Sequence, residues 1–265
     1  MALLELVRKL PYNHPYRWDG RLFGKPKLWT PSEISTKAWY DAYDLSTIVQ
    51  SGGFVSQWND KSGNSLNLAQ AVGANQPITG TRTINGVNAL DFDGVSDYIV
   101  RGSGMPDGDV MVFGVFNADA LTYGVWFGNA GSGGAKSRQY LQDSKVDFGN
   151  GGLVFSPALS AGQPYVVMGQ VDDLGNSSVH GYRINGGALT TGGTQRATPQ
   201  ASMAAGANAG GVGFFNGIIG EVIVVNSLLS DSDRQKVEGY LAWKWNLEAN
   251  FPAGHPYKST PPLVA

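Results

Sequence analysis

The stretch of sequence that decides the fold runs from Gly213 to Trp245 and reads GFFNGIIGEVIVVNSLLSDSDRQKVEGYLAWKW. Between Ile218 and Val225 most residues are β-branched, a pattern that predicts a strand covered on both faces. Ser230 is a good N-cap, and the aspartates after it place negative charge in a first helical turn. The expected helix then presents one apolar stripe, made of Val237, Tyr240, Leu241 and Trp245.

The predicted helix needs a surface to cover. Arg234, Lys236 and Glu238 lie off its apolar stripe, and the stripe itself must be buried against something. The rest of the chain consists mainly of short β-like segments, roughly a dozen, separated by turn signals. This pattern, without βαβ alternation, predicts an all-β jelly-roll sandwich over residues 36–265 with one late helix packed on it.

Length and composition fit a single β-domain and exclude several classes of protein. The 265 residues, 42% of them hydrophobic, are enough for a sizeable core, and 37 glycines indicate many turns. A net charge of -2 gives no reason to expect nucleic acid or an anionic membrane as a partner. The absence of cysteine excludes disulfides, Cys-type zinc sites and a cysteine nucleophile. We expect no signal peptide and no membrane span, because no long apolar run occurs.

Residues 1–35 differ from the rest of the chain. Aromatic residues alternate there with prolines and glycines, without the periodicity of a domain and with more rings than a disordered linker carries. An extended arm that buries its rings against a surface fits this composition. That surface is the arm's own domain, a neighbouring copy or a different protein. The rings of this predicted docking arm are Tyr12, Tyr16, Trp18, Phe23 and Trp29.

Several blocks of the sequence resemble one domain family. They read WYDAYDLSTI, VSQWNDKSGN and ALDFDGVSDYI, followed by the strand–turn–helix stretch and by LEANFPAGHPYKSTPP. Over residues 36–262 they resemble the laminin-G-like, concanavalin A-like jelly-roll domains of phage structural proteins and of bacterial surface and secreted proteins. The arm segment HPYRWDGRLFGKPKLWTPSEI resembles the leader of the phage-encoded members. The resemblance implies a jelly-roll fold, frequent glycan binding and, in some members, a calcium ion.

Glu221 is out of place in an apolar strand, where a carboxylate is solvated, paired or bound to a metal. The loop from Asp60 to Asn64 offers a carboxylate, a hydroxyl, an amide and a flexible glycine, and calcium prefers oxygen ligands of this kind. In the resembling family this loop lies beside the strand, so Asp60, Asn64 and Glu221 form a candidate calcium site. Alternatively, Asp60 and Asn64 cap an Asx turn. Lys61 would then be available as the partner of Glu221.

Sugar binding needs an exposed aromatic ring beside amide or carboxylate groups, and Tyr123, Trp126 and Tyr140 are candidates. Strand alternation puts Tyr123 and Phe127 on one face and Trp126, between two glycines, on the other. The first face is the more apolar, so Trp126 is the ring expected to be exposed. Each ring is equally a candidate for the core, because large aromatic residues are usually buried.

Glycosidases on this kind of fold need two carboxylates that flank the scissile bond. None of the glutamates lies in the acidic strand motif of the glucanase relatives. Asp91 and Asp93 point to one face of a strand, but in the resembling family the FDG-x-x-D-Y block holds a turn. His14, His180 and His255 are far apart, and none stands in a triad pattern. We therefore expect no enzymatic activity.

The resemblance to phage proteins and the aromatic arm together predict a virion structural protein, a decoration, tail or fibre-associated component assembled in the host cytoplasm. Its arm would dock on other virion proteins, and its jelly roll would project outward and bind host-surface glycans. Copies are expected to form a symmetric homo-oligomer. The alternatives are a secreted carbohydrate-binding lectin module and a glycoside hydrolase.

Overall fold

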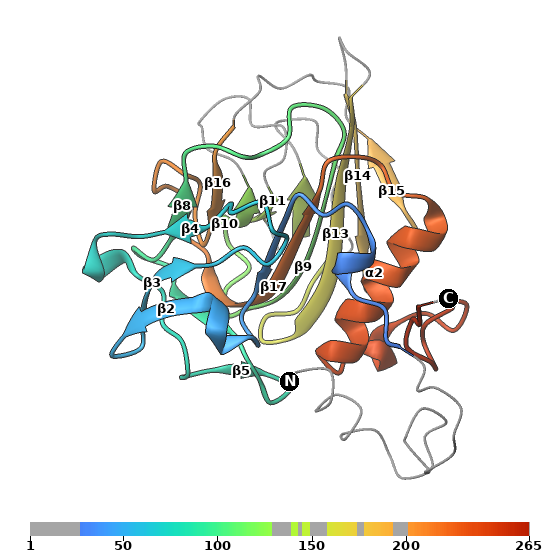
Figure 1. The fold of residues 1–265 in the computed structure, drawn as a ribbon, viewed down its shortest axis with the longest axis horizontal. Helices are drawn as coiled ribbons and strands as arrows, with labels where there is room; N and C mark the ends of the chain where they lie inside the picture. The colour runs from blue at the N-terminus through green and yellow to red at the C-terminus, as the bar shows by residue number, and fades with distance from the viewer. Residues whose placement is uncertain are drawn as a thin grey trace.

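The computed structural model describes residues 27–128, 139–142, 145–148, 158–173, 178–192 and 201–264. Two antiparallel sheets face each other, and helix α2 (Asp231–Lys244) covers the outer face of one of them (Figure 1). The predicted all-β sandwich with one late helix is confirmed. The described 3-10 turns are Pro31–Glu33, Leu45–Thr47, Gly73–Asn75 and Glu248–Asn250.

The sheet under the helix contains seven of the described strands. In spatial order these are β1 (Ala38–Asp41), β17 (Asn216–Val225), β9 (Val110–Ala118), β13 (Pro164–Asp173), β14 (Ser178–Ile184) and β15 (Thr190–Gly192). The seventh, β7 (Leu90–Asp93), pairs with the first part of β17, and β1 pairs with the rest of it. The stretch predicted as a strand covered on both faces is thus an interior strand of this sheet, paired on both of its edges.

The opposite sheet contains eight described strands. In spatial order they are β12 (Lys145–Phe148), β11 (Gln139–Gln142), β10 (Gly124–Gly128), β16 (Met203–Ala205), β8 (Ile99–Arg101), β4 (Leu68–Ala69), β3 (Phe54–Trp58) and β2 (Ile48–Ser51). A separate short hairpin joins β5 (Thr83–Ile84) to β6 (Val87–Asn88).

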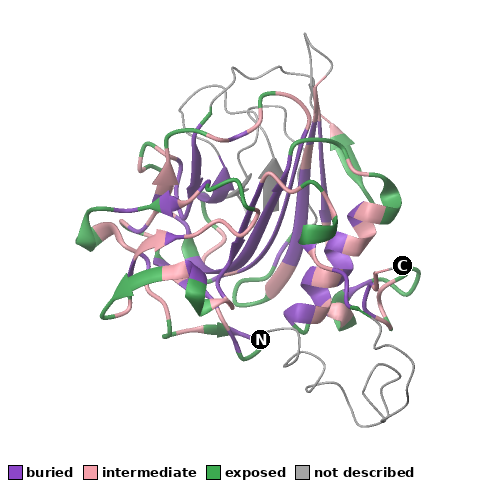
Figure 2. Ribbon diagram, viewed as in Figure 1, coloured by how far each residue is buried: buried purple, intermediate pink, exposed green. Residues whose placement is uncertain are grey.

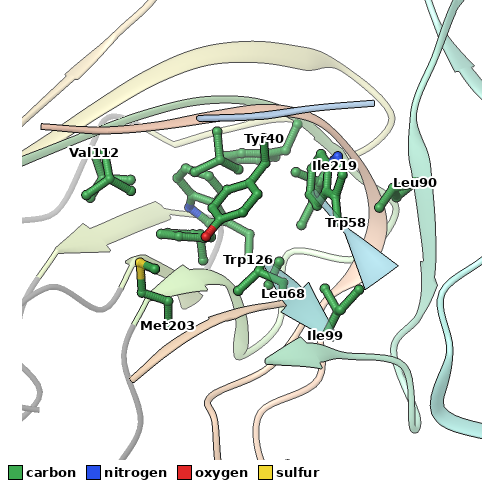
Figure 3. Packing of buried hydrophobic residues seen from close by; sticks show 14 of the residues in the cluster. Tyr40, Trp58, Leu68, Leu90, Ile99, Val112, Trp126, Met203 and Ile219 are labelled. Atoms are coloured by element: carbon green, nitrogen blue, oxygen red, sulfur yellow. The ribbon is translucent and has the colours of Figure 1, made fainter. Parts of the chain in front are cut away.

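Two hydrophobic cores stabilise this arrangement, one on each face of the seven-stranded sheet (Figure 2). The first lies between the sheets and is rich in aromatic rings, among them Tyr40 and Trp58 (Figure 3), whose ring centroids are 5.5 Å apart. The second lies between the sheet and α2. Its central members are Trp39, Phe113, Ile223, Val237, Leu241 and Trp245.

A β-bulge in β17 sets how the helix sits on the sheet. The register against β9 shifts between Ile219 and Glu221, so Gly220 is an additional residue in the strand. Gly220 and Glu221 consequently both face the helix. A Cβ on Gly220 would lie 2.5 Å from the ring of Trp245, so only glycine lets this indole reach the strand.

Helix α2 begins as predicted, because the Ser230 hydroxyl accepts the backbone N–H of Asp233 at 3.1 Å. Arg234 and Glu238, which lie off the apolar stripe, are also buried. The C-terminal segment covers that side of the helix, and the ring of Tyr257 packs where a Cβ of Gly239 would be. No helix in the described part of the chain has the length and apolarity to cross a membrane.

The described part of the predicted arm packs on its own domain. Leu28 forms a β-bridge with Leu263, and the N–H of Trp29 donates to the carbonyl of Pro262 at 3.0 Å. The Trp29 ring is 4% exposed and meets Tyr240 of α2 edge-on, so the expectation that Trp29 docks on a partner is corrected. The other four rings assigned to the arm lie in residues 1–26, outside the described residues.

We predict that Gly220→Ala destabilises the protein by about 1–3 kcal/mol, because the added methyl group collides with the buried Trp245 ring. Gly73→Ala is the matched control, since nothing lies within 4 Å of a Cβ there. Its effect should stay within about 0.5 kcal/mol. Urea unfolding of both variants measures the difference, and an equal, small effect at the two positions would contradict the packing described for the bulge.

Candidate functional site

Glu221 lies at the centre of a buried polar network under helix α2. One of its carboxylate oxygens accepts the indole N–H of Trp39 at 2.7 Å and the hydroxyl of Tyr240 at 2.9 Å. The other accepts the indole N–H of Trp245 at 2.8 Å and is 2.7 Å from the Nζ of Lys244. Both oxygens are therefore saturated, and the residue is completely buried.

Lys244 connects this carboxylate with a second one. Its Nζ is 2.7 Å from Asp41, the residue directly opposite Glu221 in the β1–β17 pair, and donates to the Tyr240 hydroxyl at 3.0 Å. All three hydrogens of the ammonium group thus have an acceptor. Asp41 also pairs with Lys61 at 2.7 Å, and this lysine is the partly exposed end of the network.

The charges in the network shift one another's pKa values. Burial acts to raise the pKa of Asp41, but Lys244 and Lys61 outweigh it and hold that pKa below its usual range. Burial raises the pKa of Glu221, with Lys244 opposing the shift. The pKa of the Tyr240 hydroxyl is far above its usual range because of burial and the nearby Glu221 carboxylate, so the phenol remains a donor. These pKa shifts follow from a structural network that is buried away from solvent.

The three residues proposed as calcium ligands do not fit such a site. The oxygens of Glu221 are occupied by the donors above, and those of Asp60 accept the backbone N–H groups of Trp39, Ser62 and Leu66 at 2.8–3.0 Å. The side-chain amide of Asn64 donates to main-chain carbonyls, so it fastens the loop to the start of β1. Nowhere in the described ranges do three metal-binding side chains converge. The Asx-turn alternative describes the loop, but Glu221 pairs with Lys244 rather than Lys61.

Trp126 is not the exposed ring that the sequence predicted. It is fully buried in the core between the sheets, where its ring centroid is 5.2 Å from that of Phe116. The physical reason is a register shift in β10 between Val125 and Phe127, which breaks the alternation on which the prediction relied. The ring fits because Gly114 faces it, where a Cβ would lie 2.5 Å away.

Tyr123 is exposed, with 43% of its surface accessible. Its ring lies over Gly213, whose Cβ would be 2.5 Å from the ring edge. The next residue in that loop, Phe214, meets Tyr98 with ring centroids 6.2 Å apart. We call this half-exposed group of Tyr98, Tyr123, Val212 and Phe214 the tyrosine surface. The third predicted glycan-binding ring, Tyr140, is on β11, and its side chain lies outside the described residues.

The loop that carries Val212 and Phe214 of the tyrosine surface is held in one conformation by Asn208. The buried amide oxygen of Asn208 accepts the backbone N–H groups of Gly210 and Val212 at 2.9 and 3.1 Å. Gly211 and Gly213 both have positive φ, which the tight turn requires. A Cβ on Gly211 would lie 3.5 Å from the Tyr98 ring, in ordinary van der Waals contact. Tyr98 and Tyr123 consequently pack against a fixed loop, and binding would not have to order that loop.

The carboxylates near this surface hold turns. The Asp93 carboxylate accepts the backbone N–H groups of Val95, Ser96 and Asp97, as the family resemblance implied. Burial and the neighbouring Asp93 raise the pKa of Asp97 to about 6. Asp91 is instead 3.0 Å from Arg82, which also pairs with Asp119 at 2.6 Å. Asp91 and Asp93 therefore do not converge on one reacting position, and the guanidinium group of Arg82 lies between Asp91 and Asp119.

Of the histidines, His255 belongs to the buried contact between the C-terminal segment and α2. Its Nε2 is 3.2 Å from Glu238, whose other oxygen accepts the Nε–H of Arg183 at 2.8 Å. His180 is buried on β14, and His14 lies outside the described residues. The histidines thus do not form a common site in the described structure.

Sequence reasoning missed Tyr98 and Phe214 as members of the exposed surface. Both adjoin strongly apolar residues, so their surroundings in sequence favour the core. The one feature of the sequence that points to this surface is the pair of glycines on either side of Val212. They indicate a loop whose backbone aromatic rings can approach closely.

No family model and no curated protein sequence matches this chain. Its fold is nevertheless similar to that of solved carbohydrate-active proteins. An arabinofuranosidase complexed with arabinofuranosyl-α-1,2-xylobiose matches with a TM-score of 0.54 and 16% identity, over 83% of this chain and 61% of that one. The chain thus covers less than two thirds of that enzyme.

Two further likenesses have similar scores. Domain 4 of AbnA, a GH43 extracellular arabinanase from Geobacillus stearothermophilus, in complex with arabinotriose, matches with a TM-score of 0.52 and 17% identity. That match covers 75% of this chain and 95% of the domain. A Trypanosoma rangeli sialidase matches with a TM-score of 0.51 and 13% identity, over 74% of this chain and 31% of that one. At such identities the likeness shows a shared fold.

These comparisons contradict the expectation that the chain has no enzymatic activity. The proteins that share its fold include glycoside hydrolases, so the fold gives no ground for excluding catalysis. The expectation rested on the missing acidic strand motif of one group of relatives, and that motif is not a requirement of every hydrolase. The likeness assigns no catalytic residue to this chain.

We predict that Lys244→Met destabilises the protein by about 3–5 kcal/mol at pH 7, because it leaves Asp41 and Glu221 buried side by side with too little positive charge. Lys236→Met on the same helix is the matched control. It removes an exposed pair with Asp233 and should cost less than about 1 kcal/mol.

The deficit of Lys244→Met should shrink as the pH falls below about 4. Lys244 helps to depress the pKa of Asp41, so its contribution is present above the ordinary carboxyl pKa and is lost as that group protonates. Denaturant unfolding at pH 7 and pH 3.5 measures this. A deficit that is small at pH 7, or equal at the two pH values, would contradict the charge arrangement described.

Proposed function

We propose that this chain is a carbohydrate-binding β-sandwich whose sugar site is the tyrosine surface. The observation that carries the proposal is the exposed ring of Tyr123, which packs on Gly213 of a fixed, glycine-rich loop next to Phe214 and Tyr98. Sugar rings pack their C–H faces on such aromatic rings, while amide and carboxylate groups bind their hydroxyls. Asn216, which is exposed, and Asp119, whose N–H donates to the Asn216 carbonyl, lie close to this loop.

The fold comparisons support carbohydrate as the ligand class. Domain 4 of the arabinanase is a separate domain, it is matched over nearly its whole length, and its structure is a complex with arabinotriose. A domain of this size and architecture is therefore sufficient to hold an oligosaccharide. The fixed loop adds a physical reason, because a preorganised surface loses little conformational entropy on binding.

Tyr123→Ala should weaken binding to neutral oligosaccharides, with arabinotriose among the probes, by about tenfold, since a stacked aromatic ring contributes on the order of 1 kcal/mol or more. Phe54→Ala is the matched control, because Phe54 is similarly exposed but lies on β3 at the other edge of the sandwich. Isothermal titration on the intact chain and both variants measures the effect.

Failure of the intact chain to bind any of the oligosaccharides would contradict the proposal, as would equal losses from Tyr123→Ala and Phe54→Ala. Since hydrolases share this fold, the same incubations should be analysed for released sugars. Release would identify the ligand as a substrate.

We further infer that the chain serves as a virion structural protein, with residues 1–26 docking on other virion proteins and the sandwich projecting outward. The composition of the arm supports this, because Tyr12, Tyr16, Trp18 and Phe23 occur with prolines in a segment that lacks the periodicity of a core. The family resemblance of the leader adds to it. Under this proposal the tyrosine surface meets glycans of the host surface, and copies assemble as a symmetric multimer.

A variant that lacks residues 1–26 tests the docking role. Because Lys27 to Trp29 are held by the C-terminal segment, the variant should melt at the temperature of the full chain but fail to associate with particles or multimers. Light scattering and thermal melting of both proteins give the answer. A variant that melts many degrees lower would place the segment in the domain's own core and contradict docking.

A further inference from the structure

A second candidate site lies at the end of the sandwich opposite to the tyrosine surface. There a cleft of about 360 Å³ opens beside the last residue of β17 and the first of β9. Along β17 this end is roughly 30 Å from Asn216, since a strand rises about 3.3 Å per residue. The cleft is lined by Lys37, Asn226 and the loop of residues 104–109.

The walls of this cleft are fixed by the fold. The backbone N–H of Lys37 donates to Val224 at 2.7 Å, and its carbonyl accepts the side-chain amide of Asn64 at 3.0 Å. On the other wall, the N–H of Met105 donates to Ala201 at 2.8 Å, and the Met105 side chain is part of the core between the sheets. Binding in the cleft would therefore require little ordering of the chain.

The cleft contains an ammonium group, two carboxylates and an amide. The ammonium of Lys37 has no ion-pair or hydrogen-bond partner among the residues that the structure describes, which makes its three donors available. One oxygen of Asp109 accepts the N–H of Asp173 at 2.9 Å, which fixes this carboxylate. Asp107 adds a second carboxylate, and the exposed Asn226 adds an amide that both donates and accepts.

This mixture selects against charged ligands. An anion would meet Asp107 and Asp109, and a metal cation would meet the ammonium of Lys37 with only two carboxylates to bind it. A ligand rich in hydroxyl groups suits both kinds of wall, because each hydroxyl accepts from the ammonium or amide and donates to a carboxylate. We propose that the cleft is a second carbohydrate site, which binds one neutral sugar residue through its hydroxyls. The choice of a sugar rests on the proposed function, whereas the location and polarity of the site do not.

The test is a titration of the intact, isotope-labelled chain with neutral monosaccharides (arabinose, galactose, glucose) and with glucuronate as the anionic counterpart, followed by NMR. Saturable shifts of the backbone N–H signals of Gly104, Gly108 and Asn226 with a neutral sugar are expected. Lys37→Met should weaken that binding at least tenfold, because a hydrogen bond from a charged group is lost. Lys27→Met, at an exposed lysine outside the cleft, is the matched control and should leave it unchanged.

The two sites are separable in this experiment. Tyr123→Ala should weaken the response at Gly211 and Gly213 about tenfold but leave that of the cleft unchanged. Shifts at the tyrosine surface without shifts in the cleft would overturn the cleft proposal and keep the proposed function. Shifts in the cleft alone would keep the cleft proposal and overturn the proposed function. A response to glucuronate only, or an unchanged response in Lys37→Met, would also overturn the neutral-sugar site.

Discussion

The ammonium group of Lys244 lies between two carboxylates that the sheet places directly opposite each other. Asp41 and Glu221 are partners across β1 and β17, and like charges in that position repel. The lysine that separates them is near the end of helix α2, so the repulsion is relieved only when the helix is docked on the sheet. A buried ion pair of this type gives weak net stabilisation but penalises every arrangement that leaves one partner alone. Its main effect here is to specify one position of the helix.

Much of the remaining structure follows from that position. The bulge at Gly220 turns Glu221 toward the helix and leaves room for Trp245. Asp41 also pairs with Lys61, which belongs to the loop that Asp60 closes, and that loop fastens the start of β1 through Asn64. The cleft beside Lys37 is thus built on the same strand as the network. The tyrosine surface is formed at the other end, where β17 begins, by a loop that has its own internal anchor in Asn208.

The sequence was sufficient for elements whose pattern is local. The strand and helix between Ile218 and Lys244, the Ser230 cap and the turn at Asp93 follow from periodicity and side-chain chemistry, and the structure has them. Glu221 could be recognised as anomalous, but its partner could not be identified. A lysine in the last turn of a helix is usually solvated, and Lys244 is buried because the docked helix places it between Asp41 and Glu221 of the sheet.

The errors have a common physical origin in departures from regular geometry. Trp126 was placed on the wrong face because a register shift in β10 breaks the two-residue alternation. The burial of Glu238 could not be predicted, because the segment that covers it is irregular and has no signal in a helical pattern. Tyr98 and Phe214 form a surface only because the loop that ends at Phe214 folds back onto Tyr98. This contact joins residues that are far apart in the sequence.

The central claim is that the network around Glu221 is closed in the native protein and opens only when the whole domain unfolds. Hydrogen exchange of the indole N–H groups of Trp39 and Trp245, followed by NMR at increasing denaturant, tests it most directly, because both donate to Glu221. The account predicts that both exchange with the free energy and denaturant dependence of global unfolding. Exchange of either indole through a low-energy local opening would show that helix α2 separates from the sheet in the folded state, and would contradict the account.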